Sequence, residues 1–104
     1  MTAPELVTVF AALGDETRWS ILVALSEGEA TASALADRLP VTRQAIAKHL
    51  TTLREVGLVE SRRVGRDVRF RIVGAQLSHT ARRLDAVGAQ WDRRLDAIRR
   101  LAEG

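Results

Sequence analysis

Residues 41–59 read VTRQAIAKHLTTLREVGLV and contain one helix with two unlike faces. Ile46, Leu50 and Leu53 recur at the spacing of a single helical stripe, which predicts a face that packs into a core. The opposite face has no carboxylate and carries only small, polar or basic residues: Arg43, Gln44, Ala47, Lys48 and Thr51. A face of this kind suits an anionic partner such as the DNA major groove, which is about 12 Å wide and admits one helix.

Capping residues and breakers predict three further short helices before this one. The third and fourth helices are separated only by a turn around Pro40-Val41, which is the spacing of a helix-turn-helix. Thr42 is predicted to cap the fourth helix and to contact a DNA phosphate as well, because helix N-termini attract phosphate. The predicted boundaries are residues 5–13 ended by Gly14, a helix capped by Asp15 and ended by Gly28, a helix capped by Thr31 or Ser33 and ended by Pro40, and a helix ended by Gly57.

A β-hairpin is predicted after the fourth helix, where the hydrophobic period changes from 3.6 to 2. Residues 68–72 alternate apolar side chains with arginines, so one strand face, including Val68, is expected to pack and the other to be cationic. A turn at residues 64–67 closes the hairpin. Arg62 and Arg66 flank this turn and are expected to meet the DNA backbone or the minor groove.

The last segment, residues 77–102, is predicted to be a long helix with a heptad-like apolar seam. A seam of this length finds no evident partner within the chain except the first helix, so the spare apolar surface indicates a homodimer. The residues expected at the dimer interface are Leu6, Phe10, Leu84, Trp91, Leu95 and Ile98.

Charge is distributed unevenly along the 104 residues, although the net charge is only +3. Residues 1–37 hold one base and six acids, residues 38–71 hold nine bases and three acids, and residues 72–104 hold six bases and four acids. The local sums are therefore −5, +6 and +2. Basicity gathered around the fourth helix and the hairpin is typical of a protein that binds nucleic acid. A chain of this length is expected to form one domain, residues 1–104.

Composition argues against several other classes of protein. The absence of cysteine excludes disulfides and thiolate metal sites and fits a reducing compartment. No signal peptide and no membrane-spanning run is recognisable, so a cytoplasmic protein is expected. An enzyme is the least favoured interpretation, because the chain lacks a Gly-rich phosphate loop and neither histidine has an evident nucleophile and orienting acid.

Three segments, residues 13–22, 42–58 and 62–66, resemble the ArsR (ArsR/SmtB-like) bacterial transcriptional regulators in order and spacing. The resemblance implies a homodimeric winged helix-turn-helix repressor whose first and last helices form the dimer interface. The fold class expected is therefore mainly α with a small β-hairpin (α+β). Its element order is helix, helix, short strand, helix, helix, strand, strand, helix.

The metal sites that many members of this family carry are not expected in this chain. Many members carry Cys-Val-Cys at the start of the third helix, where this chain reads Thr31-Ala32-Ser33. Other members bind metal through Asp and several His residues on the last helix, which here offers only His79 with scattered carboxylates such as Asp85. No metal or other cofactor is predicted, and the sequence names no small-molecule effector.

Two functions remain open at this point. The first is a sequence-specific transcriptional regulator, a repressor that binds an inverted-repeat operator in double-stranded DNA as a homodimer. The alternative is a winged-helix module that binds an acidic protein partner.

Several side chains also keep two interpretations. Arg18 either pairs locally or contacts phosphate, Trp19 and Trp91 anchor either the core or a dimer, and His49 is expected to be partly packed. The remaining hairpin arginines, Arg63, Arg69 and Arg71, are either solvated or paired with acids.

Overall fold

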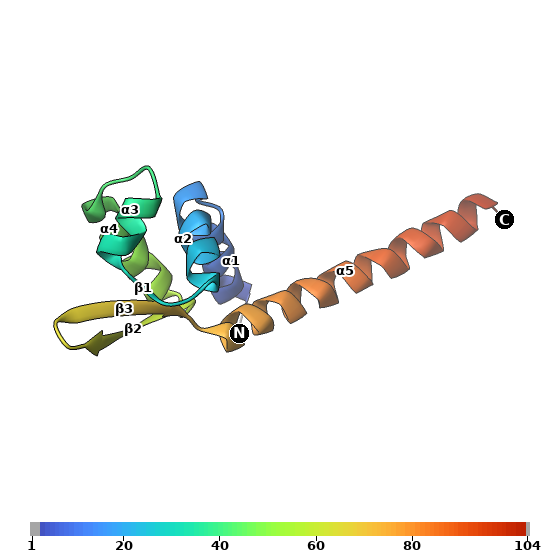
Figure 1. Cartoon of the computed structure of the whole chain (residues 1–104). Coiled ribbons are helices and arrows are strands. Elements are labelled where there is room, and N and C mark those ends of the chain that lie inside the picture. The colour runs from blue at the N-terminus through green and yellow to red at the C-terminus, as the bar shows by residue number, and fades with distance from the viewer. Residues whose placement is uncertain (1–2, 104) are drawn as a thin grey trace. The chain divides into compact units, whose positions relative to one another are not determined.

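The computed structural model describes residues 3–103, with side chains from Val7 onward, and confirms the expected fold class and element order (Figure 1). The chain divides into two compact units, one up to Gly74 and one from Ala75. The elements are α1 (Ala3–Leu13), α2 (Glu16–Ser26), β1 (Ala30–Thr31), α3 (Ala32–Arg38), α4 (Arg43–Glu55), β2 (Val59–Val64), β3 (Asp67–Ile72) and α5 (Gly74–Glu103).

Side-chain caps begin three of the helices as predicted. Asp15, Thr31 and Thr42 each accept a hydrogen bond from the backbone N–H three residues further on, at 2.9, 3.1 and 3.1 Å. Thr31, and not Ser33, therefore caps α3. Gly57 follows α4 with a φ of 79°, a left-handed conformation that glycine adopts without steric cost. The caps by Asp15, Thr31 and Thr42 each satisfy one of the backbone amides that a helix leaves without a partner at its start.

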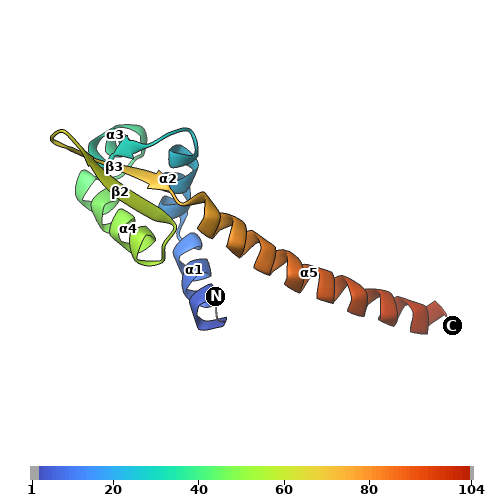
Figure 2. The ribbon, with the colours of Figure 1, turned by 90° about the horizontal axis from the view of Figure 1, so that it is seen from below.

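The core of the first unit lies where α2, α3 and α4 meet the sheet. Helix α4 contacts α2, α3 and β2, and α2 contacts β3. Figure 2 shows α4 lying alongside β2. The large side chains that are fully buried there are Ile21, Leu35, Ile46, Leu50, Leu53, Leu58 and Val59.

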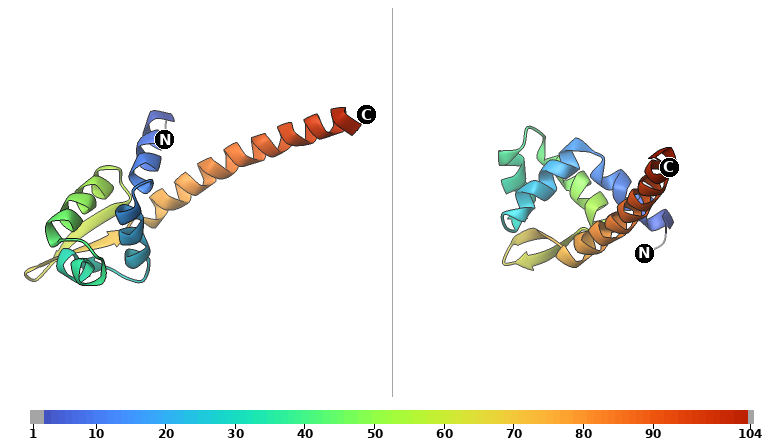
Figure 3. Two further views of the ribbon diagram at one scale, coloured as in Figure 1. Left: turned by 90° about the horizontal axis from the view of Figure 1, so that it is seen from above. Right: turned by 90° about the vertical axis from the view of Figure 1, so that its right-hand side faces the viewer.

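The sheet is antiparallel, with β3 between β1 and β2. Gly65, at a φ of 63°, is the first of the two residues in the hairpin turn, where a type II′ turn needs glycine. The turn extends beyond α3 and α4 (Figures 2 and 3). The prediction that Val68 packs is wrong, because this residue pairs with Arg63 close to the turn and is 40% exposed. Phe70 and Ile72, nearer the helices, are half-buried.

Helix α1 buries Val9 and Ala12, while Val7 and Phe10 remain exposed. Helix α1 contacts α2, so the buried pair attaches it to the rest of this unit. The side chain of Leu6, predicted at a dimer interface, lies outside the described residues. Phe10 is available for the role predicted for it.

Helix α5 is a single helix of 30 residues that begins three residues earlier than predicted. From Leu84 onward, the large apolar side chains of α5 are exposed: Leu84, Val87, Trp91, Leu95, Ile98 and Leu101. The guanidinium of Arg94 lies 5.3 Å from the centre of the Trp91 ring, within the range of a cation–π contact. Trp91 and Trp19 are 55% and 54% exposed, so neither anchors the core of the single chain.

Candidate nucleic-acid interface

The two faces of α4 differ in burial as predicted. Ile46, Leu50 and Leu53 are 0% exposed, whereas the residues of the opposite face are all exposed: Arg43, Gln44, Ala47, Lys48 and Thr51. Within the described chain, Arg43 and Lys48 form no ion pair. Both cations are therefore available to an external anion, and the small Ala47 between them lets a partner approach the helix backbone.

Thr42 stands at the positive end of the α4 dipole, next to this face. Its hydroxyl oxygen accepts from the amide of Ala45 at 3.1 Å, and the carbonyl of Thr42 accepts from the amide of Ile46 at 3.0 Å. The cap therefore fixes where the basic face of α4 begins.

Replacing Thr42 with alanine is expected to lower the free energy of unfolding by about 1 kcal/mol, because the Ala45 amide loses its acceptor. Chemical denaturation followed by circular dichroism measures this loss. Thr42→Ser keeps the hydroxyl and should unfold close to the wild type. Equal stability of the alanine and serine variants would contradict a capping role.

Arg18 holds α4 in place through a network that spans three helices. Its Nε donates to the carbonyl of Ala12 at 2.8 Å, and its Nη2 donates to the carbonyl of Ala11 at 3.3 Å. Its Nη1 lies 3.4 Å from Nδ1 of His49 on α4. Because a guanidinium can only donate, Nδ1 of His49 accepts in this contact. Arg18 therefore pairs locally, and His49 is half-buried as expected.

Asp15 completes this network beside the guanidinium of Arg18, at 3.9 Å. The hydrogen bond from the Arg18 backbone amide is the main cause that lowers the pKa of the Asp15 carboxyl. The end of α1, the start of α2 and the middle of α4 are thus tied together by one arginine and one carboxylate.

The hairpin arginines divide into paired and unpaired groups. Arg62 and Arg69 both contact Glu29, and Arg71 pairs with Glu60. Arg63 and Arg66 are exposed and make no ion pair with any described residue. The sequence left pairing open for Arg63, Arg69 and Arg71, of which the last two are paired, and it did not indicate the pairing of Arg62. Arg62 as a DNA contact stays a prediction.

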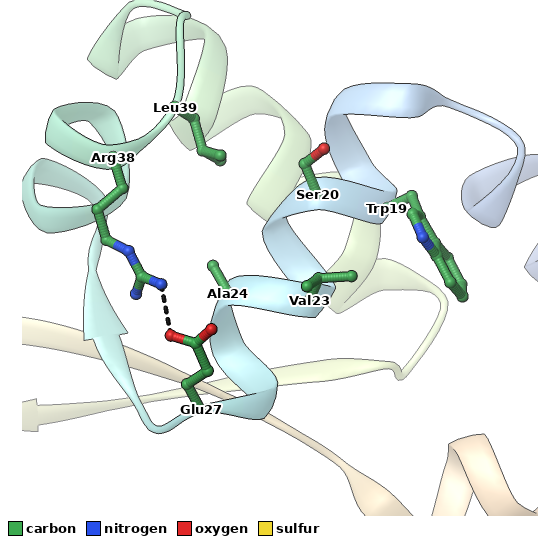
Figure 4. A pocket seen from close by; sticks show the side chains of 7 residues that line it. All are labelled: Trp19, Ser20, Val23, Ala24, Glu27, Arg38 and Leu39. Atoms are coloured by element: carbon green, nitrogen blue, oxygen red, sulfur yellow. Dashed lines mark hydrogen bonds and ion pairs between the residues drawn. The ribbon is translucent and has the colours of Figure 1, made fainter.

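A shallow pocket of about 290 Å³ lies between α2 and α3 (Figure 4). Trp19 and Val23 form one side of it, and Arg38 reaches across to the carboxylate of Glu27 at 2.7 Å. The two charged groups of the pocket are therefore satisfied by each other. This arrangement supplies no free charge that would select a ligand.

In the part of the chain that the structure describes, no helix is long and apolar enough to span a bilayer. No cluster of three or more His, Asp or Glu side chains among residues 3–103 could hold a metal ion.

Comparison with known proteins gives matches over most of the chain. Residues 13–62 match the helix-turn-helix domain family. An ArsR-like transcriptional regulator from Rhodococcus sp. RHA1 is 60% identical, with a TM-score of 0.87 over 95% of this chain and 93% of that one. The HTH-type transcriptional regulator CmtR of Mycobacterium tuberculosis is 40% identical over 84 residues, 81% of this chain and 69% of CmtR.

A third relative bears on assembly. It is a homodimeric winged helix-turn-helix DNA-binding domain from Mycobacterium bovis, described as a possible ArsR-family regulator. It is 30% identical, with a TM-score of 0.67 over 86% of this chain and 80% of that one.

Proposed function

The chain belongs to the ArsR family of winged helix-turn-helix transcriptional regulators, and from that premise we propose that it represses transcription as a homodimer on an inverted-repeat operator. The observation that carries the proposal is the contrast across α4. A face without carboxylates is exposed, while the opposite face is fully buried and fixes the helix in the core.

In this proposal α4 enters the major groove. Arg43 donates to guanine, Gln44 pairs with adenine, and Lys48 contacts a base edge or a phosphate. Ala47 allows close approach of the helix. Thr42 and the first amides of α4 meet a phosphate, which the positive end of the helix dipole attracts.

The hairpin is the wing of the fold, and its cations meet the DNA beside the groove that α4 occupies. Arg62 and Arg66 contact the backbone or the minor groove. Contacts of this kind position the protein on the duplex without reading its sequence. The proximity of β2 to α4 supports this assignment.

We also assign the two terminal helices to the dimer interface, so that residues 1–104 act as one DNA-binding domain. The exposed apolar residues of α5, including Leu84, Trp91, Leu95 and Ile98, supply most of the contact, together with Leu6 and Phe10 of α1. The homodimeric relative from Mycobacterium bovis supports a two-fold assembly.

Selection from random DNA duplexes tests the proposed function. We expect the purified protein to enrich two half-sites related by a dyad, with centres about 34–36 Å apart or a multiple of that distance. Log affinity for the enriched duplex should fall linearly with log salt concentration, because each neutralised phosphate releases counterions. A duplex with a single half-site is the control and should bind more weakly. Failure to enrich any duplex at low salt would contradict the proposal.

Repression needs a separate measurement in cells. The enriched duplex is placed across a promoter that drives a reporter, so that a bound dimer would exclude RNA polymerase. Expression of the chain should lower reporter output, and scrambling both half-sites should restore it. Raised output would instead mean activation. A bacterial operator lies in the cytoplasm, so the proposal also places the chain there.

A further inference from the structure

Two arginines face each other in the wing. Arg62 of β2 and Arg69 of β3 are direct partners in the antiparallel register. Like charges at such positions repel and destabilise a pair of strands. Glu29, which lies just before β1, contacts both guanidinium groups and relieves this repulsion.

Glu29 holds Arg62 with a two-point hydrogen bond. Nη2 of Arg62 donates to Oε1 at 2.7 Å and Nε donates to Oε2 at 3.1 Å, while Nη1 of Arg69 lies 3.5 Å from Oε1. The hydrogen bond from Arg62 is the main cause that lowers the pKa of the Glu29 carboxyl, so it is ionised at neutral pH. Two-point pairing of this kind fixes the plane of the guanidinium as well as its charge.

This pairing leaves one side of Arg62 unused. The guanidinium carries five N–H donors, and the bond to Glu29 occupies the Nε and Nη2 edge. The Arg62 side chain is 53% exposed, whereas that of Glu29 is 23% exposed. The remaining donors of Arg62 are therefore held in a fixed orientation at a partly open surface.

Glu29 also connects the wing to the helix-turn-helix. The next two residues, Ala30 and Thr31, pair with Phe70 and Arg69 of β3, and Thr31 caps α3. The carboxylate that holds the wing arginines is thus only two residues before the cap of α3, the first helix of the motif. The pairing of β1 with β3 and the cap by Thr31 thus connect the wing to α3, which in turn contacts α4.

We propose that Glu29 is a positioning residue for DNA binding, which acts through Arg62 by orienting its free N–H donors toward the phosphate backbone. This role rests on the proposed function, because it requires the wing to contact DNA. The change in DNA affinity that this role predicts for loss of Glu29 is opposite in sign to the change that charge alone predicts. A carboxylate near DNA should weaken binding, so removing one should tighten it, yet the proposed role makes Glu29 necessary for full affinity.

The sign of the effect of Glu29→Gln tests the proposal. On the enriched duplex, affinity is expected to fall about tenfold, since a charge-assisted hydrogen bond that orders Arg62 is lost. Glu27→Gln is the matched control. It removes the same charge two residues earlier, where the carboxylate pairs with Arg38 instead of the wing, and should bind as tightly as the wild type or more tightly. Tighter binding by Glu29→Gln would overturn the proposal.

A double-mutant cycle with Arg62→Gln shows whether Glu29 acts through Arg62. Glu29→Gln should cost affinity in the wild type and little in the Arg62→Gln background. An equal cost in both backgrounds would overturn the proposed route. If the wild type binds no duplex, the proposed function is contradicted, and the role of Glu29 with it. If the wild type binds but Glu29→Gln binds equally well, only the role of Glu29 is contradicted.

Two measurements keep the test valid if Glu29→Gln folds poorly. Arg62→Lys retains the charge but cannot form the two-point bond, so it should weaken binding about as much as Glu29→Gln; unchanged affinity would overturn the proposal. In the free protein, NMR should show slow exchange of the Arg62 Nε–H with water in the wild type and in Glu27→Gln. Fast exchange in the wild type would show that Glu29 does not hold Arg62.

Discussion

Replacing Trp91 and Leu95 together with glutamate is expected to convert the proposed dimer into monomers and to weaken operator binding by about 10²–10⁴-fold. Both side chains are exposed in the single chain, at 55% and 51%. In a two-fold dimer each substitution acts twice, so four large apolar groups lose their contact and four carboxylates enter the interface. The large loss follows because a dimer binds its second half-site at a high effective concentration, which a monomer lacks.

Analytical ultracentrifugation measures the change in assembly, and titration of the enriched duplex measures the change in affinity. The control is Ala86→Glu with Ala89→Glu. It adds the same two carboxylates to α5, about 140° and 160° around the helix from Trp91 at roughly 100° per residue. This control should remain dimeric. Dissociation of the control, or a dimer that survives Trp91→Glu with Leu95→Glu, would contradict the proposed interface.

The features predicted correctly from the sequence are those set by neighbours along the chain. The spacing of Ile46, Leu50 and Leu53 determines one buried face of a helix, whatever that face packs against. A cap such as Thr42 bonds an amide three residues away, so residue type and position suffice to predict it. Gly65 similarly marks a hairpin turn that only two residues span.

The features that were missed depend on contacts between distant segments. Glu29 and Arg62 are 33 residues apart, and Arg18 and His49 are 31 apart. No periodicity connects such pairs, so only the packed fold shows that Arg62 is held by an acid. Val68 shows a related limit, because alternation predicts which face a strand side chain takes but not whether the core reaches that far along the hairpin.

Arg43→Ala should cost about 1–3 kcal/mol of binding free energy for each half-site and should relax the base preference at one position of that half-site. Arg43 is the first residue of α4, is exposed, and forms no ion pair within residues 3–103. Its removal therefore takes away a donor without leaving a described carboxylate unpaired. Because a bidentate contact to guanine is specific, this loss should appear on duplexes that carry the preferred base, beyond the small loss on every duplex that follows from removing one positive charge.

Arg54→Ala separates base reading from the loss of positive charge. Arg54 also lies on α4 and is exposed, but its Nη1 donates to Ser61 Oγ at 3.0 Å, near the end of the helix away from Arg43. Both variants lose one charge, so both should weaken binding to unrelated DNA by a similar small factor. Repeating the duplex selection with each variant is the measurement. A uniform loss on every duplex for Arg43→Ala, equal to that for Arg54→Ala, would mean that Arg43 contacts only the phosphate backbone and that the base preference comes from Gln44, Lys48 or the shape of the DNA.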